Sequence, residues 1–166
     1  MLHKILQKVE RIVRIEEARA HCDIPCGIYD PHAAQIGALT VIRMLDLMDE
    51  LKASHGADTP EFAHNFTRLV MVKEEHAELV KREVRVIFGD YFKKEHVEKY
   101  PELPTLNHKI MQYASKGRQS MDRQAAMDLL DAVNRFAEIF WESKNIAVKR
   151  VKAPYKPGEE VVYPVL

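Results

Sequence analysis

The chain has 166 residues, of which 46% are hydrophobic and 30% are charged. This composition is ordinary for a globular protein of one domain with a substantial core. Lysine and arginine number 25, as do aspartate and glutamate, so no excess charge favours nucleic acid or an anionic membrane. No apolar run approaches the roughly 18 residues that span a bilayer. We therefore expect neither nucleic acid nor a membrane as a partner.

The first twenty residues, Met1–Ala20, place apolar side chains at helical spacing with lysine and arginine between them. A secretory signal needs an uninterrupted apolar core of about 7–15 residues, which this segment lacks, so we expect a cytoplasmic protein. The end of the segment, Ala18-Arg19-Ala20, nevertheless has the small-x-small form of a protease site. Taken alone, the segment is either a structural first helix or a removable leader.

The first two predicted helices each begin at a capping residue followed by proline. Residues 30–31 (Asp-Pro) begin the first helix, and residues 55–56 (His-Gly) provide its stop signal. Residues 59–60 (Thr-Pro) begin the second helix, whose apolar stripe continues to Gly89.

Two further helices are predicted after an irregular, aromatic stretch at 90–104. Thr105 begins the shorter one, which Gly117 ends. Ser120 caps the last one, whose apolar stripe up to Trp141 is the clearest in the chain. Four amphipathic helices joined by short links predict an all-α fold, namely an antiparallel up-down four-helix bundle.

Both cysteines of the chain lie in His21–Cys26, ahead of the first predicted helix. Pro25 and Gly27 favour an irregular loop there. A structural zinc site would need further cysteine or histidine ligands at finger-like spacing, which do not follow. A Cys22–Cys26 disulfide would suit an oxidising compartment, but the export signal for one is missing.

Cleavage after Ala20 would change the chemistry of this segment. His21 would then carry an α-amine with a reference pKa of about 8, which a metal can deprotonate at neutral pH. This amine, the amide nitrogen of Cys22 and the thiolates of Cys22 and Cys26 form a compact N2S2 donor set. Tetragonal coordination of this kind favours nickel(II) or copper(II) over zinc, and the His21 imidazole is tethered as an axial ligand.

The segment His21–Pro31 resembles the nickel-hook signature of nickel-containing superoxide dismutases. Four later stretches resemble segments of the same family in the same order, and the resemblance covers roughly residues 21–144: Asp90–Lys93, His96, Glu98–Leu103 and Ile139–Lys144. The resemblance implies nickel as cofactor and superoxide as substrate. It also implies a leader-processing peptidase and a homohexamer of four-helix bundles.

Carried over position by position, the resemblance implies three nickel-binding residues. These are His21 through its amine and imidazole, Cys22 through its amide and thiolate, and Cys26 through its thiolate. Asp23 would help to fix the hook, and the Ile24–Pro25 bond would be cis. Tyr29 and Tyr91 would place their hydroxyls beside the open face of the metal, where they hold water or the small anion.

Two positions depart from the family pattern. Well-known members hold the axial imidazole with a glutamate on the first helix and an arginine on the second, whereas those places are Gly37 and His76 here. A hydrogen-bonding partner normally fixes the tautomer of a ligating imidazole. We therefore expect His76, or water in the room left by Gly37, to take this role. The alternative for His76 is an ordinary core histidine.

The sequence thus predicts a removable leader (1–20), a nickel hook (21–30), a four-helix bundle (31–145) and an extended C-terminal tail (146–166). The predicted activity is conversion of superoxide to oxygen and hydrogen peroxide, with nickel alternating between its divalent and trivalent states. Two alternatives remain at this point. One is a nickel or copper carrier that uses the same hook, and the other is a structural bundle with a Cys22–Cys26 disulfide.

Overall fold

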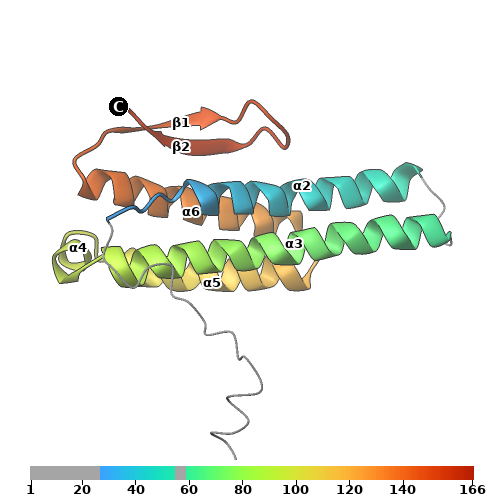
Figure 1. Cartoon of the computed structure of the whole chain (residues 1–166), viewed down its shortest axis with the longest axis horizontal. Helices are drawn as coiled ribbons and strands as arrows, with labels where there is room; N and C mark the ends of the chain where they lie inside the picture. Colours follow the sequence, from blue (N-terminus) through green and yellow to red (C-terminus); the bar gives the residue numbers. More distant parts are fainter. Residues whose placement is uncertain (1–26, 55–58) are drawn as a thin grey trace, which may run out of the picture.

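The computed structural model describes residues 27–54 and 59–166. The chain is mostly helical, as predicted, with two short strands that the all-α prediction lacks (Figure 1). The elements are α2 (His32–Ser54), α3 (Pro60–Val86), the π-helical turn η1 (Ile87–Tyr91), α4 (Lys94–Lys99), α5 (Leu103–Gln119), α6 (Arg123–Ser143), β1 (Val148–Lys152) and β2 (Glu160–Pro164). None of the helices in these two ranges is both long and apolar enough to cross a membrane.

The four long helices pack in two layers, α2 with α6 and α3 with α5 (Figure 1). Each of them contacts the next around the ring α2, α3, α5, α6, so that one core lies between all four. Three sequence predictions lie outside the described residues: the leader, the metal-binding part of the hook, and the helix stop at 55–56.

The two predicted proline-flanked helix starts are confirmed. The Thr59 side chain accepts a hydrogen bond from the amide of Phe62 at 3.1 Å, and Pro60 occupies the first helical position of α3. Asp30 accepts a hydrogen bond from the amide of His32 at 2.8 Å, and α2 begins at that residue. Both caps satisfy amide groups that the first turn of a helix leaves without intrahelical partners.

The starts of the last two long helices were predicted wrongly. Helix α5 begins at Leu103 rather than Thr105, because Pro104 is tolerated in the first turn, where no backbone N–H is needed. The N-cap of α6 is Asp122, whose carboxylate accepts from the amide of Ala125 at 3.1 Å. Ser120 instead donates its hydroxyl proton to the carbonyl of Lys116 at the end of α5. The stretch predicted as irregular also contains the short helix α4.

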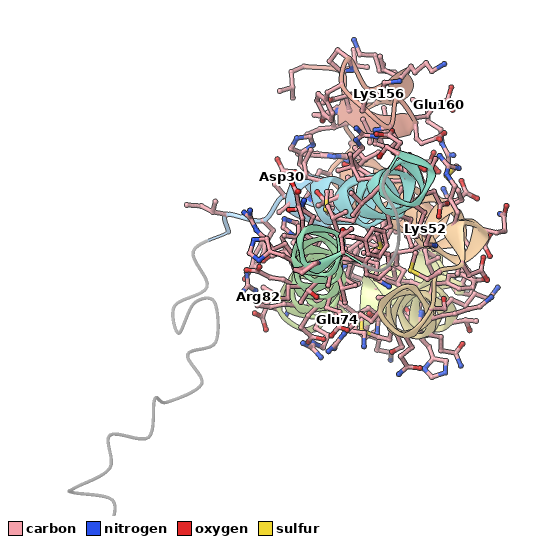
Figure 2. All side chains as sticks on the ribbon, turned by 90° about the vertical axis from the view of Figure 1, so that its right-hand side faces the viewer. Asp30, Lys52, Glu74, Arg82, Lys156 and Glu160 are labelled. Carbon is pink, nitrogen blue, oxygen red and sulfur yellow. The ribbon has the colours of Figure 1, made fainter. Side chains whose placement is uncertain are left out.

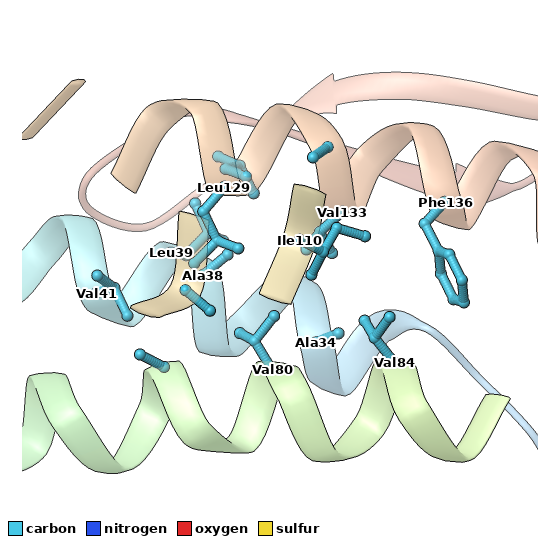
Figure 3. Packing of buried hydrophobic residues seen from close by; sticks show 14 of the residues in the cluster. Ala34, Ala38, Leu39, Val41, Val80, Val84, Ile110, Leu129, Val133 and Phe136 are labelled. Atoms are coloured by element: carbon cyan, nitrogen blue, oxygen red, sulfur yellow. The ribbon is translucent and has the colours of Figure 1, made fainter. Parts of the chain in front are cut away.

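The core is built from the apolar stripes of the long helices. Figure 3 shows Val80 and Val84 of α3 pointing toward Ala34 and Ala38 of α2, and all four side chains are fully buried. Helix α6 supplies the largest share, as its clear stripe predicted: Ala126, Leu129, Val133, Phe136, Ala137 and Phe140 are inaccessible to solvent. Full burial of a valine, leucine or phenylalanine side chain contributes roughly 1.5–3 kcal/mol.

Lys73 of α3 is buried among these apolar residues, with only 3% of its surface exposed. Its ammonium group donates to the carbonyl oxygens of Gly117, Arg118 and Ser120, at 2.9, 3.0 and 2.6 Å. These carbonyls belong to the C-terminal end of α5, where helical carbonyls lack intrahelical donors. Burial lowers the pKa of Lys73, and the nearby Glu74 opposes this shift. The lysine thus ties α3 to the end of α5.

Residues 146–166, predicted as an extended tail, form an antiparallel hairpin that packs on its own chain. Strand β1 pairs with β2 in a register that places Val151 opposite Val161. Val161 and Val162 are only 0% and 1% exposed, which makes the hairpin part of the folded body. Figure 2, a view along the helices, shows Lys156 and Glu160 of the hairpin on the opposite side of the helices from Glu74 and Arg82.

Candidate metal centre and its surroundings

The predicted nickel ligands His21, Cys22 and Cys26, together with Asp23, lie outside the described residues. In the residues that are described, no group of three or more histidine, cysteine, aspartate or glutamate side chains could hold a metal ion. The donor set of His21–Cys26 combines an amine, an amide nitrogen and two thiolates. This chemistry suits a tetragonal nickel ion, so the residues present fit the metal.

The segment Gly27–Pro31 shows how the chain leaves the hook and enters α2. Gly27 has a φ of 72°, a left-handed conformation that favours glycine, so the chain can turn sharply directly after Cys26. Ile28 points outward and is 76% exposed, whereas Tyr29 is half-buried. The exit from the hook therefore lies against the helices, with Tyr29 as its inward anchor.

Tyr29 and Tyr91, both predicted as site residues, are brought together. Their ring centroids are 5.9 Å apart and the ring planes are inclined at 52°. Tyr29 comes from the segment that precedes α2, and Tyr91 is the last residue of η1. Because only residues 27 and 28 separate Cys26 from Tyr29, the tyrosine pair lies beside the exit of the hook.

The π-helical turn η1 places Tyr91. The amide of Phe92 donates to the carbonyl of Ile87 at 3.2 Å, a five-residue step that widens the end of α3. Phe92 is buried in the core, whereas Tyr91 is half-buried and reaches Tyr29. π-Helical turns of this kind are frequent at functional sites. Because of η1, Tyr91 and its buried neighbour Phe92 point in different directions.

Ser143, at the end of α6, orients the Tyr91 hydroxyl. The Ser143 Oγ lies 2.7 Å from the Tyr91 hydroxyl and 2.7 Å from the carbonyl oxygen of Phe140. A carbonyl oxygen only accepts, and a serine hydroxyl has only one proton. Ser143 therefore donates to Phe140, and Tyr91 donates to Ser143. The phenolic oxygen of Tyr91 is left to act as an acceptor on its other side.

A cation and three further rings surround Tyr91. The ammonium group of Lys144 lies 4.7 Å from the centroid of the Tyr91 ring and 5.1 Å from that of Phe140. His96 stacks on Tyr91 with centroids 5.3 Å apart, and Phe92 meets it edge-on at 5.1 Å. The resulting cage holds the tyrosine ring in place and puts a positive charge beside it.

Sequence reasoning assigned no role to Ser143, Lys144 or His96. All three lie within the stretches that resemble the nickel-containing family, Ile139–Lys144 and His96, and that resemblance was the available signal. The contact of Lys144 with Phe140 was also accessible, because residues four apart share one face of a helix. Their contacts with Tyr91 could not be predicted from the sequence, because these contacts depend on how η1 lies against α6.

The position of Gly37 contradicts the prediction of room for water. A Cβ atom at Gly37 would lie 2.8 Å from Val80 Cγ2 and 3.1 Å from the carbonyl oxygen of His76. Helices α2 and α3 therefore approach each other closely at this point. Their contact fills the position that a Cβ atom would take, so a water molecule does not fit at that position.

His76 lies across the same contact, on α3. The ring is half-buried, and its Nδ1 atom lies 2.9 Å from the carbonyl oxygen of Val72. Because the carbonyl can only accept, Nδ1 carries a proton in this hydrogen bond, and Nε2 is the nitrogen that would act as acceptor in the corresponding tautomer. His76 is thus half-buried and not part of the buried core. Its Nε2 atom is the ring nitrogen that the bond to Val72 does not use. Any contact between His76 and the hook lies outside the described residues.

Known proteins resemble this chain over most of its length. The family model described as nickel-containing superoxide dismutase matches residues 16–144. The nickel superoxide dismutase of Streptomyces coelicolor is 41% identical over 125 residues, which are 75% of this chain and 88% of that protein. The corresponding protein of Streptomyces seoulensis is 38% identical over 128 residues, with 75% and 88% covered. A solved structure of native nickel superoxide dismutase has a TM-score of 0.64 at 40% identity and covers 75% of this chain and 99% of that chain.

These matches define a helical metalloenzyme that acts on superoxide. The chain belongs to the nickel-containing superoxide dismutase family. The predicted family, its oxidoreductase activity and its nickel cofactor are thereby confirmed. The match to the family model ends at residue 144, directly before the C-terminal hairpin.

Proposed function

We propose that this chain dismutates superoxide at a nickel ion bound by His21, Cys22 and Cys26. The observation that carries the proposal is the meeting of Tyr29 and Tyr91, at 5.9 Å between ring centroids, beside the exit of the hook. The two residues come from distant parts of a chain that belongs to this enzyme family. Their contact places both predicted site tyrosines beside the segment that leads from the hook into α2.

In this proposal a peptidase first removes residues 1–20. The new terminus at His21 supplies its amine and imidazole, Cys22 its amide nitrogen and thiolate, and Cys26 its thiolate. With Ala20 still attached, the amine donor is missing. With these residues as its ligands, nickel would supply a one-electron couple between its divalent and trivalent states. Overall, two superoxide anions and two protons give one oxygen and one hydrogen peroxide.

The two tyrosines divide the handling of the substrate. Tyr91 has committed its proton to Ser143, so its oxygen accepts a hydrogen bond from water or from a protonated product. Tyr29, whose ring contacts that of Tyr91, is proposed to help hold water or the small anion beside the metal. The ammonium group of Lys144, over the Tyr91 ring, adds positive charge beside Tyr91 that would attract the anion.

His76 is proposed to position the imidazole of His21. Its Nε2 lone pair can accept the N–H of the His21 ring, a hydrogen bond that would fix the tautomer of that ligand. The bond from Nδ1 to the carbonyl of Val72 holds the His76 ring in the required orientation. Asp23 is proposed to stabilise the hook itself.

The assembly and location of the enzyme belong to the same proposal. The hook is proposed to precede an antiparallel up-down four-helix bundle of α2, α3, α5 and α6, supported by the contacts that link these helices in a ring. A homohexamer is proposed on the family resemblance alone. A cytoplasmic location is part of the same proposal, and the balanced charge supports the expectation of no nucleic acid or membrane partner.

Intact mass and nickel content of the purified protein, followed by pulse radiolysis, test the proposal. Protein that begins at His21 should bind one nickel ion per chain and accelerate superoxide decay. Two matched controls should do neither: the uncleaved chain, and the cleaved Cys26→Ser variant. Cleaved protein that carries zinc or no metal, and leaves superoxide decay at the rate in buffer, would overturn the proposal. Nickel binding without faster decay would instead favour a carrier.

A further inference from the structure

The C-terminal hairpin is an addition to the matched family region, and it touches the helix that follows the hook. The family match ends at residue 144, before β1 begins. The Tyr163 ring of β2 lies 5.7 Å from the ring of His32, which is the first residue of α2. The hairpin, the last element of the chain, thus contacts the beginning of the first described helix.

Two buried amide side chains extend this contact into the core. Gln35, in the first turn of α2, donates from Nε2 to Asn134 Oδ1 at 2.9 Å. Asn134 of α6 in turn donates from Nδ2 to the backbone carbonyl of Glu160 at 2.8 Å. Gln35 and Asn134 are only 1% and 2% exposed. Because an unpaired amide is costly at such depth, Asn134 fixes α2 and β2 relative to each other.

Ion pairs continue the connection along the surface. Arg123 of α6 bonds to Asp46 of α2 at 2.7 Å and to Glu159, next to β2, at 3.1 Å. Arg150 of β1 bonds to Glu138 of α6 at 2.7 Å. Exposed pairs of this kind contribute little stability each, but they favour one arrangement of the three elements. The hairpin is consequently attached to both α2 and α6.

We propose that the hairpin is a brace that fixes the first turn of α2 and thereby the direction in which the nickel hook leaves the helices. Only residues 27–31 separate Cys26 from α2. On one side of this segment Tyr29 rests on Tyr91, and on the other the hairpin holds α2 through Tyr163 and Asn134. Asn134 and Tyr163 are therefore positioning residues. The effect on the hook rests on the proposed function, whereas the effect on α2 does not.

Hydrogen exchange in the full chain without nickel tests the brace itself. The reporters are the amides of Ala34 and Gln35, which both bond to the carbonyl of Pro31. The Asn134→Asp variant keeps an acceptor for Gln35 but loses the donor to Glu160. The second variant, Tyr163→Leu, removes the ring contact with His32. Exchange at these amides should become about tenfold faster in both variants, as expected for the loss of one buried contact. The control Lys149→Ala changes an exposed β1 side chain and should match the wild type.

Amides in the middle of α5, such as those of Ile110 and Ala114, distinguish a local effect from general destabilisation. In both variants these amides should exchange at the same rate as in the wild type. Unchanged exchange at Ala34 and Gln35 in both variants would overturn the brace. An equal acceleration in α5 would overturn it too, because the hairpin would then stabilise the whole fold without positioning α2.

Nickel release tests the consequence for the hook. In chains that begin at His21, transfer of nickel to a chelator should be about tenfold faster in Asn134→Asp and Tyr163→Leu than in the wild type or Lys149→Ala, in proportion to the local opening. Unchanged release combined with faster exchange would overturn the positioning of the hook. If even the cleaved wild type bound no nickel, the proposed metal site would fail, while the exchange result would still decide the brace.

Discussion

Tyr91 donates its phenolic proton to Ser143 across 2.7 Å. The direction of this bond is set by the next one, since the single hydroxyl proton of Ser143 is given to the carbonyl of Phe140. Ser143, at the end of α6, thereby orients the Tyr91 side chain. It also leaves the Tyr91 oxygen as a hydrogen-bond acceptor for other groups.

Replacing Ser143 with alanine should therefore alter how the enzyme treats anions. Without its acceptor, the Tyr91 proton becomes available to a small anion, so azide should inhibit the Ser143→Ala enzyme at lower concentration than the wild type. Superoxide decay should slow by roughly 3–10-fold, because the phenol loses its fixed position. Inhibition assays and pulse radiolysis measure the two effects. In a Tyr91→Phe background, Ser143→Ala should change neither. A full effect in that background would show that Ser143 acts on something other than Tyr91.

The role proposed for His76 predicts a change at the metal. His76→Gln should alter the electron paramagnetic resonance signal of trivalent nickel and slow superoxide decay, because the imidazole of His21 would lose the acceptor that orients it. His108, on the exposed face of α5, is a matched control, and His108→Gln should change neither property. If His76→Gln leaves both the signal and the turnover unchanged, His76 has no part in holding the ligand.

The close approach of α2 and α3 predicts an unusual response to alanine. Alanine is normally favoured over glycine in a helix by about 1 kcal/mol. At Gly37, however, a Cβ would meet Val80 Cγ2 at 2.8 Å, so Gly37→Ala should lower the free energy of unfolding by about 1–3 kcal/mol. Urea unfolding measures this change.

Gly117 is the matched control for this experiment. A Cβ at Gly117 would meet Val41 at 3.4 Å, so Gly117→Ala should be neutral or slightly stabilising. In a Val80→Ala background the cost of Gly37→Ala should largely disappear. A Gly37→Ala protein as stable as the wild type would show that the two helices separate easily, contrary to the close contact described above.

Lys73 should prove important for stability although it is charged and buried. Lys73→Met keeps much of the side-chain volume but leaves three carbonyl oxygens without their donor, at 2.6–3.0 Å in the wild type. We expect a loss of about 1–3 kcal/mol, which in a chain of this size lowers Tm by roughly 2–4 °C per kcal/mol. Thermal unfolding measures it. The exposed Lys109 on α5 is the control, and a Tm for Lys73→Met equal to that of Lys109→Met would contradict the expectation.

The sequence correctly predicted those elements that depend only on residues close together in the chain. The cap at Thr59 depends on its own side chain and the next three residues, and the stripe of α6 follows from helical periodicity alone. Sequence also indicated Tyr29 and Tyr91 as a pair, but through resemblance to a family and not through any local rule. Where the pair lies could be learned only from the packed helices.

Features set by contacts between distant segments escaped prediction. Periodicity assigns a lysine to the surface, whereas Lys73 is buried because its acceptors come from a helix end more than forty residues away. The hairpin was missed for a related reason. Adjacent Val161 and Val162 are both buried, so β2 lacks the alternation that marks a strand with one face in water.

The contact between Tyr163 and His32 joins the two ends of the described chain, and this affects the order in which the molecule is completed. Translation delivers the start of α2 long before the strand that covers it. During synthesis the first turn of α2 therefore lacks its covering strand, and the contact forms only after β2 has left the ribosome. Emergence of β2 is thus the earliest moment at which the start of α2 attains its native environment.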